Sequence, residues 1–257
     1  MKRMIRVVVC CGMLFCGTLQ AQDLDAQLEW QQRIELGTVV NGVVGRVNVT
    51  AGEPVTRGAL LVELDQRPLQ ARLVKAVAQK EAAKQQMDEA KRELDRSLEL
   101  YDRTLLSDHE RQLAEIDAAK ADAYLREAEA ELTLIKLARE YSRIKAPFNG
   151  RVLVVNVQQG QAVVNRLQIM PLVVMVNDRQ MKAVTAVDSE MAARLRPGQA
   201  AKVGVHGEWL PGVIQSVGLE PMAGSGTPRH YRLVVGFKTP KGQQLRLGEK
   251  AVVRIDG

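Results

Sequence analysis

The stretch 69-LQARLVKAVAQKEAAKQQMDEAKRELDRSLELYDRTLLSDHERQLAEIDAAKADAYLREAEAELTLIKLAREYSRIKA-146 contains no glycine and no proline, and it lies between Pro68 and Pro147. The sequence on either side of it is rich in valine and is repeatedly interrupted by glycine. Both glycine and proline disfavour the interior of a helix. The stretch therefore predicts two long helices, and the flanking sequence predicts short β-strands.

The first helix is expected from about residue 66 to residue 104, with Asp65 as its cap and Pro68 in its first turn. Apolar or small residues then recur at alternating intervals of three and four, which is the heptad pattern of a coiled-coil seam. The seam residues are Leu69, Leu73, Ala76, Ala83, Met87, Ala90, Leu94 and Tyr101, and the seam is interrupted at Lys80 and Ser97.

The second helix is expected to begin near Ser107, because Ser107 and Glu110 fit a capping box. The short link between the helices permits only an antiparallel hairpin, which we assign to residues 66–145. The second seam consists of Ala114, Ala118, Ala121, Leu125, Ala128, Leu132 and Ile135. Alanine buries a single methyl, worth ~0.8 kcal/mol against ~1.5–3 kcal/mol for a large aliphatic side chain. We therefore expect the hairpin to depend on its base for rigidity, with neighbouring copies as a second source.

A repeat flanks the hairpin. The pattern Gly-x-Val-x-x-Val-x-Val-x-x-Gly-x-x-Val occurs from Gly42 to Val55 and again from Gly150 to Val163 without a gap. Gly42, Gly52, Gly150 and Gly160 suit backbone positions that need a positive φ, and the valines alternate onto one face. Antiparallel helices return the chain to where it left, so the two halves, residues 37–65 and 146–177, are expected to close on each other at the base of the hairpin.

The remainder, residues 178–257, alternates apolar and polar residues between turns that contain glycine or proline. Strands are expected at residues 181–187, 200–205, 209–217, 231–237 and 250–255, with a short helix at 188–195. This spacing predicts a small antiparallel β-barrel. Residues 22–36 form either a polar lead-in or the first strand of that barrel. The predicted fold class is mainly β with one long α-helical hairpin.

The first 21 residues have the pattern of a secretory signal peptide: a basic start, an apolar run at residues 7–19, and the small residue Ala21 at the end. The run is shorter than the roughly 20 residues that a spanning helix needs. An uncleaved anchor and a lipoprotein site at Cys16 are the alternatives. The sequence therefore indicates export.

All three cysteines (Cys10, Cys11 and Cys16) lie in this leader, so cleavage would leave no disulfide and no thiolate metal site. The formal net charge of +6 includes three basic residues of the leader, Lys2, Arg3 and Arg6, which leaves +3. This charge is too small to argue for nucleic acid as a partner.

The sequence predicts no catalytic site, no metal site and no cofactor. The histidines (His109, His206 and His230) are scattered, without the spacing of metal ligands on one helix face. The methionines at 170, 175, 181 and 191 are more typical of core packing than of metal handling. A lipoyl-type carrier would need a lysine in a tight turn between the two halves, and the whole hairpin occupies that connection.

Three stretches resemble the periplasmic adaptor, or membrane fusion protein, family (HlyD-like). Residues 42–65 and 144–163, which include "IKAPFNGRV", look like the two lipoyl half-motifs of a split barrel-sandwich hybrid. Residues 178–255 look like the family β-barrel, through "LRPGQAAKV" and "LRLGEKAVVRI". Full-length members continue into a membrane-proximal domain, which we expect to be missing after the barrel here.

The resemblance implies a periplasmic protein associated with the inner membrane, which bridges an inner-membrane transporter of the RND or ABC type and an outer-membrane channel in a tripartite efflux pump. It also implies a homo-oligomeric ring, commonly a hexamer. Part of the family contacts the channel through Arg, Leu and Ser at the hairpin tip, and Arg96, Leu100 and Ser107 have that spacing. Ser107 is in addition a helix cap, and Arg96 could equally be a solvated charge.

Two other functions are compatible with the same sequence. The first is an exported coiled-coil scaffold or regulatory binding protein without a pump partner. The second is an adaptor for type I protein secretion, which would usually bring a true membrane span and a longer hairpin. A transporter gene beside this one would favour the efflux adaptor, and an isolated gene would favour the scaffold.

Overall fold

The computed structural model describes residues 22–164, 170–222, 229–240 and 242–255. The expected signal peptide, residues 1–21, lies outside the described residues. The chain divides into two compact units, one formed by residues 32–177 and the other by the segments on either side of it. Each unit is described below by itself.

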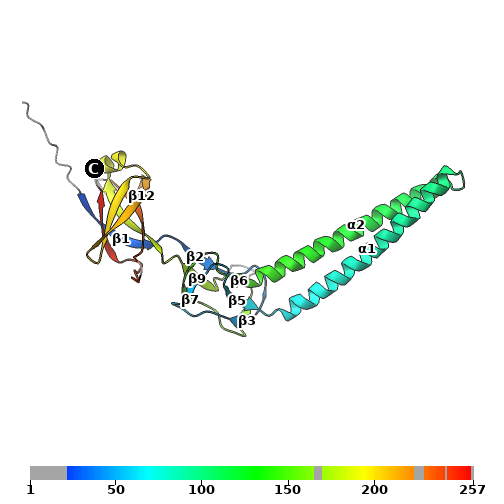
Figure 1. Ribbon diagram of the computed structural model, residues 1–257, viewed down its shortest axis with the longest axis horizontal. Coiled ribbons are helices and arrows are strands. Elements are labelled where there is room, and N and C mark those ends of the chain that lie inside the picture. Colours follow the sequence, from blue (N-terminus) through cyan, green and yellow to red (C-terminus); the bar gives the residue numbers. More distant parts are fainter. Residues whose placement is uncertain (1–21, 165–169, 223–228, 241, 256–257) are drawn as a thin grey trace, which may run out of the picture. The chain divides into compact units, whose positions relative to one another are not determined.

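The first unit contains two four-stranded sheets and a helical hairpin (Figure 1). One sheet has the order β2-β9-β7-β4, and the other has the order β6-β5-β3-β8. Their strands are β2 (Arg33–Leu36), β3 (Gly42–Val47), β4 (Pro54–Val55), β5 (Leu60–Leu64), β6 (Arg143–Lys145), β7 (Gly150–Val155), β8 (Ala162–Val163) and β9 (Val173–Val176). A common core fills the space between the sheets, with Leu61, Val62, Val152, Val173 and Met175 fully buried.

The two halves of the sequence repeat pair with each other in equivalent ways. Strand β3 of the first half pairs with β8 of the second, and β7 of the second half pairs with β4 of the first. The Gly52 N–H donates to the Val152 carbonyl at 2.8 Å, and the Gly160 N–H donates to the Val44 carbonyl at the same distance. Each half therefore completes the sheet of the other, as the repeat predicts.

The four glycines of the repeat act in two different ways. Gly52 and Gly160 have φ values of +87° and +86°, a conformation that L-residues rarely adopt. Gly42 and Gly150 do not have a positive φ, which corrects the expectation for these two positions. They are instead sites of close approach, since a Cβ on Gly150 would lie 2.1 Å from the Val176 carbonyl oxygen and one on Gly42 would lie 3.3 Å from Leu64 Cδ1.

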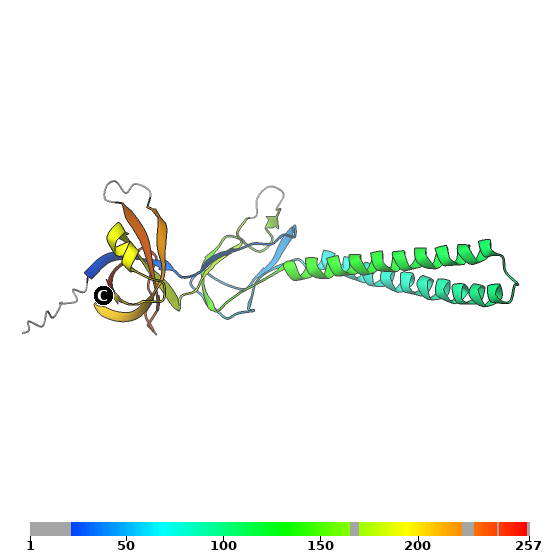
Figure 2. The same cartoon turned by 90° about the horizontal axis from the view of Figure 1, so that it is seen from above.

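The hairpin consists of α1 (Arg67–Asp102) and α2 (Asp108–Tyr141), which lie side by side in both views (Figures 1 and 2). Its bounds differ from the expected ones at both ends. The cap of α1 is Gln66 rather than Asp65, although the Asp65 carboxylate accepts a hydrogen bond from the Arg67 N–H at 3.0 Å. Residues 143–145 form strand β6, because they pair with β5 in the sheet.

The predicted seams are the faces on which the two helices meet. Every predicted seam residue of α2 is buried or half-buried, and so are those of α1 up to Leu94. At the tip the pattern shifts, because Leu100 is half-buried and Tyr101 is 38% exposed. Both interruptions belong to the seam: Ser97 is buried, and Lys80 forms an ion pair with Glu129 across the helices at 3.4 Å.

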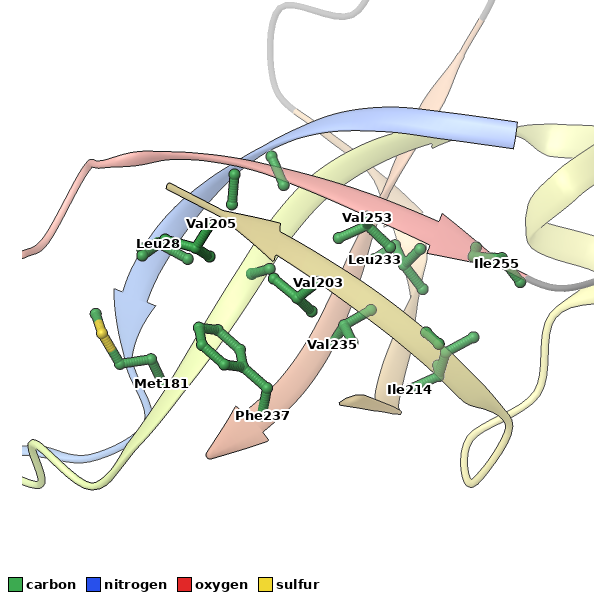
Figure 3. Close-up of a cluster of buried hydrophobic side chains, with 14 of the residues drawn as sticks. Leu28, Met181, Val203, Val205, Ile214, Leu233, Val235, Phe237, Val253 and Ile255 are labelled. Atoms are coloured by element: carbon green, nitrogen blue, oxygen red, sulfur yellow. The ribbon is translucent and has the colours of Figure 1, made fainter. Parts of the chain in front are cut away.

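The second unit contains a closed six-stranded barrel of order β1-β10-β13-β12-β11-β14. Its elements are β1 (Gln22–Trp30), β10 (Gln180–Asp188), α3 (Ser189–Arg194), β11 (Ala200–Val205), β12 (Glu208–Pro221), β13 (His230–Lys238) and β14 (Lys250–Ile255). Buried side chains from all six strands fill it, and Figure 3 shows ten of them by name, among them Leu28, Met181 and Phe237. Residues 22–36 were expected to form either a polar lead-in or the first strand of the barrel. Strand β1 is such a barrel strand, because it pairs with both β10 and β14.

We predict that Gly150→Ala lowers the free energy of unfolding of the sandwich by about 2–3 kcal/mol, because the new Cβ overlaps a backbone carbonyl that cannot move aside. Urea denaturation of the purified protein measures the change. The equivalent substitution in the other half, Gly42→Ala, is the matched control, with an expected loss under about 1 kcal/mol since it meets only the end of a leucine side chain. Equal losses of stability in the two variants would contradict the close approach of Gly150 to the Val176 carbonyl.

Candidate functional site

The loop at the hairpin tip ends α1 in a Schellman motif. The Thr104 N–H donates to the Tyr101 carbonyl at 2.8 Å, and the Leu105 N–H donates to the Leu100 carbonyl at 2.9 Å. These two bonds satisfy carbonyls that the end of a helix leaves free. These two hydrogen bonds therefore fix the backbone conformation at the end of α1.

Thr104 adopts the left-handed conformation that this motif requires, with φ +59°. Glycine is the usual residue there, because a Cβ in this conformation costs roughly 1–2 kcal/mol. Threonine is branched at Cβ, which makes the conformation rarer still. Its hydroxyl donates to the Arg103 carbonyl at 2.7 Å, which holds the side chain against the turn. The tip thus contains a strained residue.

A complete capping box begins α2 on the other side of the loop. The Ser107 hydroxyl accepts from the Glu110 N–H at 3.3 Å and donates to the Glu110 carboxylate at 2.6 Å, and the carboxylate also accepts from the Ser107 N–H at 3.0 Å. The Ser107 hydroxyl and N–H lower the pKa of Glu110 below its usual value. Because the pKa of Glu110 is lower in the folded state, the capping box stabilises the fold at a pH above the ordinary glutamate pKa. This stabilisation is lost as the pH falls through the lowered pKa.

Arg111 braces the tip from the side of α2. Its guanidinium lies over the Tyr101 ring, 5.1 Å from the ring centroid, and it also pairs with Asp108 and Glu115. The hydrogen bond from Arg111 to Asp108 and the charges around it raise the pKa of Arg111 further above its already high value. The guanidinium stays charged and couples the last turn of α1 to the first turns of α2.

The three expected contact residues lie near the tip, but their side chains are partly occupied. Arg96 is exposed on α1 and forms an ion pair with Glu93 at 2.8 Å. Leu100 is half-buried in the seam, and the Ser107 hydroxyl is engaged in the capping box. Leu105 is a residue of the tip loop that the sequence analysis did not single out. It is 70% exposed, the highest value among the large apolar side chains of residues 96–112.

The base of the hairpin is fastened by polar side chains. The Gln66 Nε2 donates to the Ser142 Oγ at 2.8 Å, which joins the cap of α1 to the cap of α2. Ser142 is completely buried, and its hydroxyl donates to the Arg139 carbonyl at 2.7 Å. On the sandwich side, the Thr38 hydroxyl donates to the Tyr141 carbonyl at 2.9 Å. Hydrogen bonds at this junction thus hold the helices to the sheets.

Among the described residues, no three His, Cys, Asp or Glu side chains are grouped as they would be around a metal ion. Within that part of the chain, no helix is both long and apolar enough to cross a membrane.

The unit that contains the sandwich and the hairpin matches a known protein family. The sequence model of the family described as "RND MFP, barrel-sandwich hybrid domain" matches residues 32–175, which include both halves of the sandwich and the whole hairpin. The chain belongs to the RND membrane fusion proteins. This result confirms the family resemblance and the fold class predicted from the sequence.

Two curated relatives of this membrane fusion protein carry export in their names. The chain is 26% identical to the macrolide export protein MacA of Yersinia pestis, over 74% of this chain and 56% of the relative. It is 29% identical to the pyoverdine export membrane fusion protein PvdR of Pseudomonas aeruginosa, over 68% of this chain and 48% of the relative. The chain thus spans about half the length of the curated relatives it matches.

Solved structures of membrane fusion proteins share the fold. The structure of Spr0693 from Streptococcus pneumoniae has a TM-score of 0.70 at 15% identity, covering 90% of this chain and 97% of that one. The structure of MacA from Actinobacillus actinomycetemcomitans has a TM-score of 0.67 at 20% identity, covering 91% of this chain and 78% of that one. At these identities the likeness establishes the fold alone.

We predict that Thr104→Gly raises the thermal unfolding temperature of the hairpin, because glycine adopts the required φ without strain. A gain of about 1 kcal/mol corresponds to roughly 2–4 °C in a chain of this size. Circular dichroism at the helical band measures the change. Thr104→Ala is the control, since it keeps a Cβ and should shift the temperature by less than about 1 °C. Identical shifts for the two variants would argue against strain at this position.

Proposed function

We propose that this membrane fusion protein is the adaptor subunit of a tripartite efflux system, bridging an inner-membrane transporter of the RND or ABC type and an outer-membrane channel. The observation that carries the proposal is the sandwich whose two halves are separated in sequence by a long hairpin, within a region that matches the family. The relatives named for macrolide export, multidrug resistance and pyoverdine export support it.

The dimensions of the hairpin suit a bridging role. Helix α1 has 36 residues, which at about 1.5 Å per residue amounts to roughly 54 Å. An enzyme would not need such a projection, and the adaptor has no catalytic role in this proposal. In the proposed assembly the chain is exported to the periplasm, is associated with the inner membrane, and extends its hairpin tip toward the channel.

The outer faces of the hairpin support self-association into a ring. On α1, the residues that directly follow the seam include Val74 and Val77, which are 60% and 49% exposed. On α2, the residues that directly precede the seam include Leu113 and Leu134, which are 46% and 60% exposed. Because the helices are antiparallel, these two strips lie on opposite sides of the hairpin. One copy can therefore place its α1 strip on the α2 strip of the next.

The charges along the strips are complementary in a parallel arrangement. Ala76 packs with Leu132 across the seam, which fixes the level of the two helices. Counting equal numbers of residues from that pair, Asp88 lies level with Lys120, and Lys91 lies level with Asp117. Lys120 and Asp117 also form an exposed ion pair with each other within α2 at 3.0 Å. A contact between two different faces of the same chain generates a ring when the rotation closes. We propose such a ring, with six copies as the resemblance implies.

We predict that exchanging the charges of one strip, in Asp88→Lys with Lys91→Asp, weakens self-association by at least about tenfold, because two attractive pairs become repulsive. Adding Asp117→Lys with Lys120→Asp to the same chain should restore it. Sedimentation velocity at low and high salt measures both. Exchanging Glu89 and Arg92, an exposed ion pair on the other side of α1, is the control and should have no effect. If the chain with all four substitutions stays monomeric, the proposed arrangement is refuted.

We predict that deletion of the gene, in the bacterium that encodes it, abolishes export of at least one compound, and that the full-length chain supplied in trans restores it. Intracellular accumulation of a panel of macrolides, siderophores and other drugs measures the effect. A chain without residues 67–141 is the control for the hairpin and should not restore export. Unchanged export of every compound, with normal expression of the wild-type protein, would favour the exported scaffold without a pump partner.

A further inference from the structure

An aromatic ring on the outer surface of the barrel lies flat against the sheet. Trp209 on β12 is directly opposite Gly204 on β11. A Cβ on Gly204 would lie 3.2, 3.3 and 3.3 Å from three neighbouring atoms of the indole ring. Three nearly equal distances mean that a face of the ring, rather than its edge, covers the glycine. Because position 204 has no Cβ, the ring can rest directly on the strand.

A charged side chain holds the same ring in place. The central carbon of the Arg254 guanidinium lies 4.1 Å from the centroid of the Trp209 ring, which is a cation–π contact. The Arg254 Nε and Nη2 donate to the two carboxylate oxygens of Asp23 at 2.6 and 2.8 Å. These hydrogen bonds lower the pKa of Asp23, so the pair stays charged. The ring is thus fixed from two sides, and Trp209 is still 43% exposed.

The exposed part of the ring borders a trough on the barrel surface. Trp209, Asp25 and Lys250 line a hollow of about 340 Å³. Asp25 and Lys250 also line a second hollow, of about 510 Å³, so the two hollows are continuous. At its far end the trough reaches the ion pair of Arg232 and Glu29, whose atoms are 2.6 Å apart. We call this feature the Trp209 trough.

The larger hollow exists because two strands of the barrel separate. Strand β1 pairs with β10 only through residues 27–30, although β1 begins at Gln22. Just beyond the last pair, the buried Thr185 hydroxyl donates to the Asp25 carbonyl at 2.6 Å. A side chain therefore replaces the missing bond between the strands and keeps them a fixed distance apart. The trough is a built part of the barrel.

The charges in the middle of the trough are available to a ligand. Among the described residues, neither the Asp25 carboxylate nor the Lys250 ammonium has a hydrogen-bond or ion-pair partner. The carboxylate accepts hydrogen bonds and the ammonium donates them. One acid and one base also leave no excess of either sign, so the trough does not favour a polyanion or an acidic lipid surface. It fits a ligand that has both hydrogen-bond donors and acceptors, together with an apolar face for the indole.

The strands beside Trp209 disfavour an extended peptide as that ligand. A peptide that binds a sheet pairs with a free strand edge. Strand β14, which forms the floor of the smaller hollow, is already paired with β1 on one side and with β11 on the other. A sugar ring needs no strand edge. It presents a face of C–H bonds that packs on the negative face of an aromatic ring, and its hydroxyls both donate and accept.

We propose that the Trp209 trough binds a glycan strand of the cell wall, that is, a chain of N-acetylated hexosamine rings. Trp209 stacks on the apolar face of one ring, Asp25 accepts from hydroxyl groups, and Lys250 donates to hydroxyl or acetamido oxygens. An elongated trough suits a chain of rings better than a single one. The proposal rests on the proposed function, because an assembly that bridges the two membranes has to pass through the cell wall.

The first measurement is co-sedimentation of the purified full-length chain with insoluble peptidoglycan sacculi, as a function of protein concentration. The wild type is compared with Trp209→Ala and with Val213→Ala. Val213 is the matched control, since it is an apolar residue on the same strand with a similar exposed fraction, 48%, and it does not line the trough. Circular dichroism of each chain shows whether the fold is kept.

The second measurement leaves the site unchanged. The chain has two tryptophans, so Trp30→Phe makes Trp209 the single one. Its fluorescence is then titrated with the tetrasaccharide of N-acetylglucosamine. A stacked sugar ring changes the surroundings of the indole, so the emission should change and reach saturation. An emission that stays constant would contradict stacking on Trp209, whatever the substitution at 209 does to the fold.

The expected result is that the wild type and Val213→Ala sediment with the sacculi, and that Trp209→Ala binds roughly tenfold more weakly, because the aromatic contact is lost. Equal binding by Trp209→Ala, or no binding by the wild type, would overturn the inference. So would binding to lipopolysaccharide vesicles in place of sacculi. If Trp209→Ala instead weakens self-association in sedimentation velocity, the trough is an interface between copies and the inference fails.

These outcomes are separate from those that test the proposed function. Binding to sacculi needs neither a transporter nor a channel, so its absence leaves the efflux adaptor standing. A gene deletion without effect on export would remove the adaptor role, while the binding of the purified chain to sacculi could still be measured.

Discussion

Two backbone hydrogen bonds, on which the hairpin-bearing unit depends, join residues that lie 100 and 116 positions apart along the chain. The Gly52 N–H reaches the Val152 carbonyl, and the Gly160 N–H reaches the Val44 carbonyl. Both glycines have a positive φ, so the turns that aim these N–H groups are of a kind that glycine adopts without strain. Because each half of the repeat completes the sheet of the other, the sandwich forms only when the hairpin brings its two ends together.

Much of this arrangement could be predicted because the signals are local or periodic. The seam of α2 and its capping box are set by spacing within a few residues, and the structure confirms both. The repeat is visible in the sequence because equivalent positions need the same backbone conformation, as the positive φ of Gly52 and Gly160 illustrates. The strand at residues 250–255 likewise follows from simple alternation.

What could not be predicted depends on contacts between distant segments. For residues 22–36 the sequence left a polar lead-in and a barrel strand as alternatives, and only the pairing of β1 with β10 and β14 decides between them. The hydrogen bond between Gln66 and Ser142 joins the two ends of the hairpin, so neither residue stands out alone. The exposure of Leu105 could not be predicted, because the sequence gives no measure of exposure in a loop. Gly150 was explained wrongly, since its close approach to Val176 is a tertiary contact.

The pairing of β1 with β14 has a consequence for how the molecule is made. Asp25 lies opposite Val252, so the barrel encloses the whole of the sandwich in sequence, and the sandwich in turn encloses the hairpin. The hairpin is inserted into the sandwich, and the sandwich is inserted into the barrel. In a chain that emerges from its N-terminus first, residues 22–26 of β1 stay unpaired until β14 arrives, because β10 pairs only with residues 27–30. The barrel is then the final part to close, and the exposed β1 is the segment that a chaperone would need to protect meanwhile.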